Sequence, residues 1–268
     1  MLIDWAAALK PLADTRMYHW NKEGKFTITN PAQQHDIPWL HSGSVSAGFD
    51  EAGVDCGVLI IYHDYIFKGK SIHSVCMDCF KVSVVPQTLE HVHKIAEWQQ
   101  GELADLGWAS KVGMERRSYT FNKWGAYFYC RGLEQARERY KIVREWVDKN
   151  LGEEIDVYIK RGCTEFEAAM GPSDKWEIPP GQEYIEAEGR EKIFDMKPWR
   201  GEQAEAIQHW IWNAWDEWDK SIQKAVTYHE DDLFEPVAYE VKQVPAPVAF
   251  RDLRHSLVEE TVPHEERK

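Results

Sequence analysis

The chain has 268 residues, of which 43% are hydrophobic and 13% aromatic, and its formal net charge is −13. This composition supports a large buried core, and no apolar run is long enough to span a bilayer. The negative charge disfavours nucleic acid and anionic membranes as partners of the whole chain. Because the first ten residues lack the basic start and apolar stretch of a signal peptide, we expect a cytoplasmic protein with reduced thiols.

The first 75 residues are predicted to form a β-rich extension that packs on a core domain. Residues 2–13 have the pattern of a short helix ended by Pro11, and residues 16–29 alternate around a glycine as a hairpin does. Residues 30–54 are rich in Pro, Gly, Ser and His and are expected to form a loop. The continuous apolar run at 58–62 predicts a buried strand, followed by a second short strand near Ile66.

The middle of the chain has the most regular pattern. A strand at 80–85 alternates at period two, and apolar residues then recur at helical spacing up to Leu103. Two extended runs, 110–120 and 124–130, precede a second helix and a last strand that ends at Arg161. This order of elements predicts an α+β protein with a ferredoxin-like βαββαβ core at about residues 80–162.

The rest of the chain is predicted to form three further parts around this core. The core domain with its site is expected to span residues 76–170, and a Trp-rich helical segment follows at 171–233, with a long amphipathic helix at about 201–228. Residues 234–268 contain four prolines and are expected to form an extended arm. This arm suits a homo-oligomer or a subunit of a larger assembly.

Four cysteines that are far apart in the sequence fall at related strand ends. Cys76 and Cys79 precede the first core strand, Cys130 ends the third, and Cys163 follows the fourth. In a βαββαβ fold the spatial strand order is 4-1-3-2, which places the start of strand 1 beside the ends of strands 3 and 4. Since reduced thiols favour metal ligation over disulfides, the sequence predicts a four-cysteine metal site.

The spacing of these cysteines favours a [4Fe–4S] cluster over zinc. Four-cysteine zinc sites usually contain two C-x-x-C motifs, whereas this chain has one such motif and two isolated cysteines. A cubane cluster takes one sulfur at each of its corners, which suits ligands that are spread further apart. Arg131 and Arg161 adjoin two of the cysteines and are expected to compensate the negative charge of the cofactor.

Other interpretations of these residues remain open. Cys130 and Cys163 are also compatible with small buried residues at strand ends, because free cysteine is often buried. His73 is an alternative ligand near the C-x-x-C motif. Cys56 is interpreted as a packed core residue, although it is a fifth thiol close to the site in this topology.

The function predicted from these features is that of a metal-binding protein whose cluster is redox-active or structural. No motif identifies a catalytic residue, although Glu165 and Glu167 are the nearest candidates for acid or base chemistry. The alternative is an RRM-like nucleic-acid-binding module with structural zinc, because strand alternation places lysines with Tyr127, Tyr129 and Tyr158 on one sheet face. If another segment covers that face, the tyrosines belong to the core. A third alternative is an assembly subunit that is stapled by the metal site.

Overall fold

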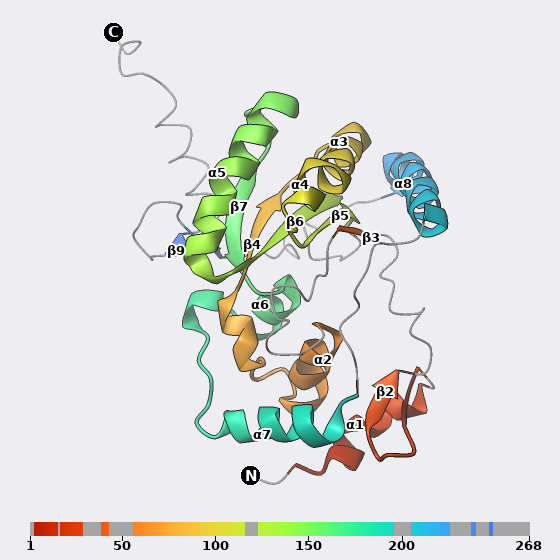
Figure 1. The fold of residues 1–268 in the computed structure, drawn as a ribbon, viewed down its shortest axis with the longest axis vertical. Coiled ribbons are helices and arrows are strands. Elements are labelled where there is room, and N and C mark those ends of the chain that lie inside the picture. The colour runs from red at the N-terminus through yellow and green to blue at the C-terminus, as the bar shows by residue number, and fades with distance from the viewer. Residues whose placement is uncertain are drawn as a thin grey trace.

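The protein has a mixed α+β structure. The computed structural model describes residues 3–15, 17–28, 39–42, 56–115, 123–195, 205–225, 237–239 and 247–248. These residues form an antiparallel sheet with several helices, which confirms the predicted α+β class. Figure 1 shows two halves, one built on the sheet and the other built mostly of helices with a small hairpin.

The large sheet is formed by strands from every part of the chain. Its strands are β3 (Trp39–Ser42), β4 (Cys79–Val84), β5 (Ser110–Met114), β6 (Trp124–Arg131), β7 (Val157–Arg161), β8 (Ala238–Tyr239) and β9 (Pro247–Val248). They lie in the order β3-β5-β6-β4-β7-β8-β9, and neighbouring strands are antiparallel. β4 lies between β6 and β7, and Phe80 is the cross-strand partner of both Cys130 and Arg161. This register decides which residues share a face of the sheet.

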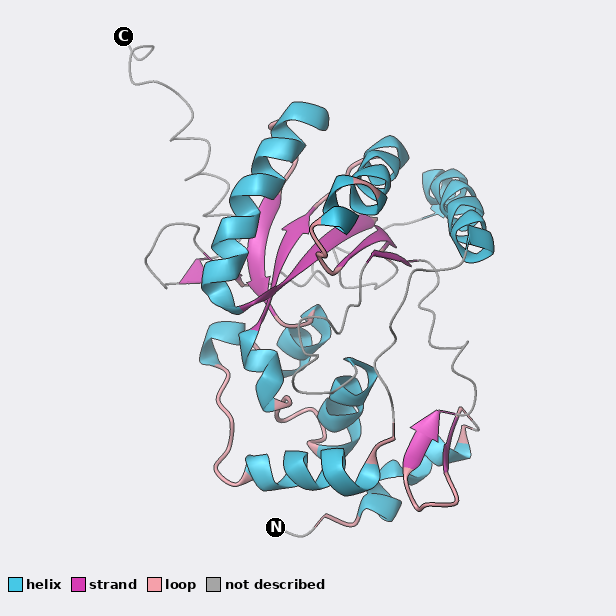
Figure 2. Cartoon of the chain, in the orientation of Figure 1, coloured by secondary structure: helices cyan, strands magenta, loops and turns pink. Residues whose placement is uncertain are grey.

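Helices cover one face of this sheet (Figure 2). They are α3 (Leu89–Gln100), α4 (Glu102–Asp105) and α5 (Gly132–Asn150), and α8 (Glu205–Ala225) packs beside α3. Alternation in β4 turns Phe80, Val82 and Val84 toward the helices, where they meet apolar residues spaced three and four apart on α3 and α5. Ile211 and Trp215 of α8 complete this cluster, which we call the sheet core.

The other half of the molecule has a core of its own. Its elements are α1 (Trp5–Asp14), the hairpin of β1 (Tyr18–Trp20) and β2 (Phe26–Ile28), α2 (Cys56–Ile61), α6 (Thr164–Met170) and α7 (Gln182–Glu188). Their buried apolar side chains form a second cluster, which we call the helical core. Gly189 allows close packing here, because a Cβ at this position would lie 1.8 Å from the hydroxyl oxygen of Tyr62.

Two neighbouring connections join the sheet to the helical half. A 3₁₀ turn, Ser74–Asp78, leads directly into β4, and β7 leads through Gly162 into α6. Gly162 has a φ of 59°, and its N–H donates to the carbonyl oxygen of Cys79 at 2.7 Å. Both connections contain cysteines, so the junction between the two halves is also where several thiols lie.

Most helices and strands of the middle region lie where the sequence pattern predicts them, but the N-terminal extension is not β-rich in the described residues. The predicted hairpin is confirmed, whereas the predicted strands at 58–62 and near Ile66 are wrong. α2 and a π-helical turn, Tyr62–Ile66, occupy that region. Val58, Leu59 and Ile61 are all buried, and a short helix embedded in a core has no polar face that would reveal its period.

Other boundaries also differ from the predicted ones. Pro11 lies inside α1, which continues to Asp14, so the predicted end of this helix is wrong. A proline removes one helical hydrogen bond, but α1 still continues for three residues beyond Pro11. β3 falls in the segment 30–54 that was expected to be a loop, and most of that segment lies outside the described residues. The segment after Cys163, which has an irregular pattern, contains α6 and α7.

The C-terminal third agrees with its pattern in part. α8 forms within the predicted helix, where Trp215 is buried and Trp210 is 56% exposed. The short strand β8 pairs with β7, so this part of the predicted arm belongs to the sheet. Most of residues 234–268 lies outside the described residues. No helix in the described part of the chain combines the length and the apolar character needed to cross a membrane.

Candidate metal centre

Four thiols from three segments of the chain gather at the junction between the two halves. Cys56 begins α2, Cys76 lies in the 3₁₀ turn, Cys79 begins β4, and Cys163 immediately precedes α6. Cys76 and Cys79 are buried, whereas Cys56 and Cys163 are partly accessible. None of these cysteines forms a disulfide.

The thiols of Cys76 and Cys79 have raised pKa values. Burial raises the pKa of Cys76 well above its ordinary value, and the charges of Cys79, Cys163 and Cys56 raise it further, while Lys81 lowers it. Burial also raises the pKa of Cys79 to about 12, against the opposing effect of Lys81. The buried thiols of Cys76 and Cys79 therefore favour their protonated form, and a nearby cation would favour the thiolate form.

Cys130 lies near Cys79, whose pKa it helps to raise, but on the other face of the sheet. In the sheet it is paired with Phe80, whereas Cys79 is paired with Arg131, so the two cysteines point to opposite faces. Cys130 packs in the sheet core, where burial raises its pKa to about 11 and Arg139 opposes that effect. The charge of Cys56 acts on Cys76 and that of Cys130 acts on Cys79, so both of these thiols lie near the C-x-x-C motif, Cys130 on the opposite face of the sheet.

Lys81 is the cation closest to the thiols. It lies on the same face of β4 as Cys79, is buried, and its Nζ is 3.3 Å from the Sγ of Cys163. The same Nζ lies 5.2 Å from the centre of the Tyr129 ring. Burial acts to lower the pKa of Lys81, but Cys163, Tyr129, Cys79 and Glu165 together raise it well above its ordinary value.

Lys160 is the cross-strand neighbour of Lys81 and has its own partners. Its Nζ lies 2.7 Å from the hydroxyl oxygen of Thr164 and 3.5 Å from a carboxylate oxygen of Glu167. Lys160 and Glu167 are both almost completely buried. Glu167 also accepts hydrogen bonds from the backbone N–H groups of Ser173 and Val237. These contacts hold α6 against the sheet, and they engage the carboxylate that the sequence suggested for acid or base chemistry.

The two arginines that were expected to compensate the cofactor charge lie on different faces of the sheet: Arg131 is the cross-strand partner of Cys79, and Arg161 is the partner of Phe80. Arg131 is exposed at the end of β6. Arg161 shares a face with Phe80, stacks its guanidinium over the Phe80 and Tyr239 rings, and donates to the carbonyl oxygen of Ser173 at 2.9 Å. The charges that lower the pKa of Cys79 are those of Lys81 and Lys160. Lys81 and Lys160 therefore provide positive charge near Cys79 on this face of the sheet.

A buried polar network holds the turn that carries Cys76. Glu186 of α7 accepts hydrogen bonds from the backbone N–H of Ser74 at 2.8 Å and from Gln182 at 2.6 Å, and one of its oxygens lies 3.6 Å from Nδ1 of His73. Burial lowers the pKa of His73, and Glu186 opposes that effect. His73 therefore faces the Glu186 carboxylate, and the network fixes the turn from the side of the helical core.

The sheet face with lysines and tyrosines is largely covered. Tyr129, Tyr158, Lys81 and Lys160 are all buried, and Tyr127 donates a hydrogen bond to Glu115. Tyrosines that stack bases must be open to solvent. In this structure Tyr129 and Tyr158 belong to the interior.

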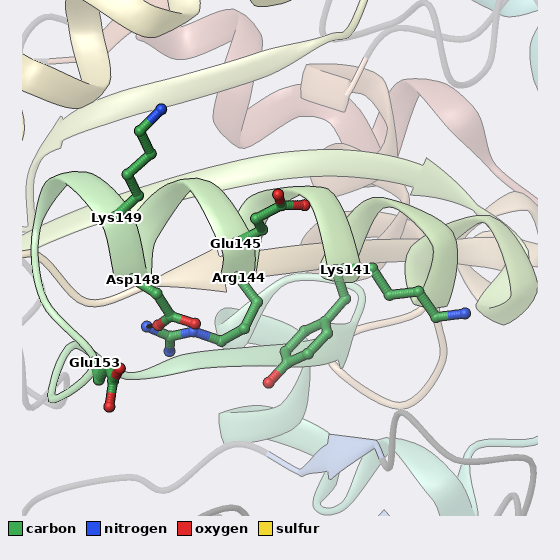
Figure 3. Close-up of a pocket in the computed structure, with 7 residues that line it drawn as sticks. Lys141, Arg144, Glu145, Asp148, Lys149 and Glu153 are labelled. Carbon is green, nitrogen blue, oxygen red and sulfur yellow. Dashed lines mark ion pairs between the residues drawn. The ribbon is translucent and has the colours of Figure 1, made fainter. Parts of the chain in front are cut away.

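A surface hollow lies along α5 (Figure 3). It is lined by residues of α5 and the following loop, among them Lys141, Arg144 and Asp148. Arg144 pairs with Asp148 and donates to the carbonyl oxygens of Ile155 and Gly152, which ties the end of α5 to the loop. Its guanidinium thus has structural partners and does not form a site for a ligand.

Comparison with known proteins gives no further guide to the site. No protein-family model, no curated protein and no solved structure matches this chain. Within the part of the chain that the structure describes, no three His, Cys, Asp or Glu side chains form a group that could hold a metal ion. The cysteines near the junction therefore do not form a ready-made set of metal ligands in this structure.

Proposed function

We propose that this protein binds a [4Fe–4S] cluster through Cys56, Cys76, Cys79 and Cys163. The observation that supports this most is the gathering of thiols from three distant segments at one buried junction. The spread of the ligands, one C-x-x-C pair and two isolated cysteines, favours a cubane cluster over a single zinc ion. When bound, the cluster supplies one-electron chemistry or a covalent link between the sheet and the helical half.

We also propose that the scaffold is a ferredoxin-like core at about residues 80–162. The chain order β4-α3-β5-β6-α5-β7 and the sheet order β5-β6-β4-β7 support this proposal. In this scaffold the C-x-x-C motif precedes the central strand β4, and Cys163 follows its neighbour β7. The additional strands β3 and β8 extend the two edges of the sheet.

Metal and sulfide analysis of the full chain tests the proposed function. The protein is purified without oxygen, and iron, acid-labile sulfide and zinc are measured per chain together with the visible spectrum. We expect a brown protein with about four iron and four sulfide ions per chain. A colourless protein with one zinc ion per chain would instead support a structural zinc site. A protein that contains neither metal would overturn the proposal.

Assembly through the C-terminal arm remains a second proposal, because most of that segment lies outside the described residues. Deleting residues 249–268 leaves β8 and β9 in place. If the arm joins copies of the chain, this deletion lowers the mass measured by light scattering to that of one chain. No observation in the structure favours nucleic-acid binding, because Tyr129 and Tyr158 are buried.

A further inference from the structure

Strand β8 is very short, yet both of its residues are buried on the outer edge of β7. The strand consists of Ala238 and Tyr239, and its register with β7 pairs Tyr239 with Ile159. Ala238 is fully buried, and Tyr239 is 4% exposed. Because a ladder between two-residue strands contributes little stability by itself, side-chain contacts must hold this part of the chain in place.

Side chains of the sheet and of the segment that follows β7 provide these contacts. We call them the β8 socket: Phe80, Arg161, Glu167 and Ser173. The backbone N–H of Val237 donates to the Glu167 carboxylate at 3.2 Å. The hydroxyl oxygens of Ser173 and Tyr239 lie 3.0 Å apart. The Tyr239 ring meets the Phe80 ring edge-on at 5.3 Å between centres, and its own centre lies 5.4 Å from the Arg161 guanidinium carbon.

The β8 socket is also held together by contacts that do not involve residues 237–239. The Nζ of Lys160 lies 3.5 Å from one oxygen of Glu167, and the backbone N–H of Ser173 donates to the other at 3.2 Å. Arg161 donates to the carbonyl oxygen of Ser173 at 2.9 Å. A site whose groups are already held in place loses less conformational freedom on binding. Residues 237–239 therefore occupy the β8 socket much as a peptide does when it adds a strand to a sheet edge.

The connection that leads to β8 is long enough to reach more than one β8 socket. α8 ends at Ala225 and packs beside α3, β3 and β5, whereas β8 lies four strand positions from β5. Four strand spacings amount to about 20 Å. The eleven residues 226–236 span at most about 40 Å. This length suffices for the β8 socket of the same chain and also for that of an adjacent copy.

We propose that the β8 socket binds residues 237–239 of a second copy of this chain, so that two copies exchange their C-terminal strands. The structure shows which sequence fits: a small residue buried against Tyr158 at position 238, and a tyrosine that meets Ser173 at position 239. A second copy carries this sequence. The exchanged strand makes the same contacts as the strand in its own chain, so the exchange costs little free energy. This inference goes beyond the proposed metal binding and does not depend on it.

Sedimentation equilibrium of the full chain and its variants over a range of concentrations tests the exchange. Y239A empties the aromatic part of the β8 socket, whereas Y239F keeps the ring and loses the contact with Ser173. The matched control is Y184A, because Tyr184 on α7 is 75% exposed. We expect a wild-type dimer whose dissociation constant rises at least about tenfold in Y239A and less in Y239F. Y184A should match the wild-type protein.

Two results would overturn the exchange directly. They are a wild-type chain that stays a monomer at every concentration, and a dimer whose dissociation constant is the same in Y239A. Circular dichroism checks the fold of each variant. If Y239A does not fold, Y239F decides, since it must still weaken the dimer.

A truncation separates this exchange from assembly through the residues beyond β9. Deleting residues 249–268 leaves β8 and β9 in place, so the exchange predicts that the dimer persists. A mass of one chain after this deletion would overturn the exchange and assign the contact to the deleted residues. Iron and sulfide contents enter none of these outcomes, so a failure of the proposed metal centre remains distinguishable.

Discussion

The two faces of strand β4 differ in chemistry although both are buried. Toward the helices, Phe80, Val82 and Val84 form part of the sheet core. On the other face, Cys79 and Lys81 point into a thiol-rich and polar interior. Burying polar and charged groups costs free energy that apolar residues would not cost. One face of β4 therefore stabilises the fold, and the other is organised around a site.

The cysteines follow the same division. Cys130 packs among apolar side chains of the sheet core, whereas Cys56, Cys76 and Cys163 pack in or against the helical core. Cys79 connects them, as the first residue of β4 on the polar face. Thiols at neighbouring strand ends can therefore lie in different environments, because the face of the sheet decides what surrounds them.

The largest effect is expected when a ligand on the polar face is removed. Replacing Cys76 or Cys79 by serine should abolish bound iron and sulfide, because the remaining thiols cannot complete the coordination of the cluster. Met77 provides the matched control, since it lies between the two cysteines and M77L conserves its volume. Iron and sulfide analysis of the three variants measures the effect. Iron retained at the wild-type level in C76S or C79S would refute the assignment of that cysteine.

A large loss of stability is expected when the buried ion pair on the polar face is broken. K160M leaves Glu167 as an uncompensated charge in the interior and should lower the free energy of unfolding by about 3–5 kcal/mol. The double variant K160M/E167Q removes that charge and should recover part of the loss. Urea unfolding of both variants measures the difference. If the single and double variants were equally stable, the loss of stability in K160M would not come from the uncompensated charge of Glu167.

A smaller effect is expected in the network beneath the C-x-x-C motif. E186Q weakens the charged hydrogen bonds to Ser74 and Gln182 and should cost about 1.5–3 kcal/mol in the free energy of unfolding. The matched control is E183Q on the exposed side of α7, where little change is expected. Urea unfolding measures the free energy of unfolding of both variants. If E183Q were as destabilising as E186Q, the network would have no special role in holding the turn.

The smallest effects compare adjacent residues on the two faces of β4. V82A removes two methyl groups from the sheet core and should cost about 1–2.5 kcal/mol. S83A removes a buried hydroxyl that has no hydrogen-bond partner in the described structure and should change stability by less than about 0.5 kcal/mol. Thermal or urea unfolding measures the stability of V82A and S83A. A larger loss in S83A than in V82A would contradict the division between the faces.

Much of the central fold can be predicted from sequence periodicity. β4, α3, α5 and β7 follow clear strand or helix patterns, because each has one face in the sheet core. α2 could not be predicted in the same way. Its residues 56–61 form a nearly continuous apolar run, and such a run has the same appearance in a buried strand and in an embedded helix.

The site could be predicted only in part. The C-x-x-C motif and Cys163 can be located in the fold because they adjoin predicted strand ends. The position of a strand end, however, does not determine on which face of the sheet a side chain lies. Alternation contains that information: Cys130 is two residues from the helix-facing Phe128, whereas Cys79 is one residue from Phe80. Lys81, two residues after Cys79, could have been found by the same rule. Cys56 could not, because its position depends on α2.

The iron and sulfide contents of C56S and C130A, purified side by side as full chains without oxygen, test the central claim most directly. The structure predicts that C56S loses the cluster, because Cys56 lies with the thiols at the junction. C130A should retain the wild-type content, because Cys130 lies in the sheet core on the opposite face. Loss of the cluster in C130A together with its retention in C56S would contradict this account.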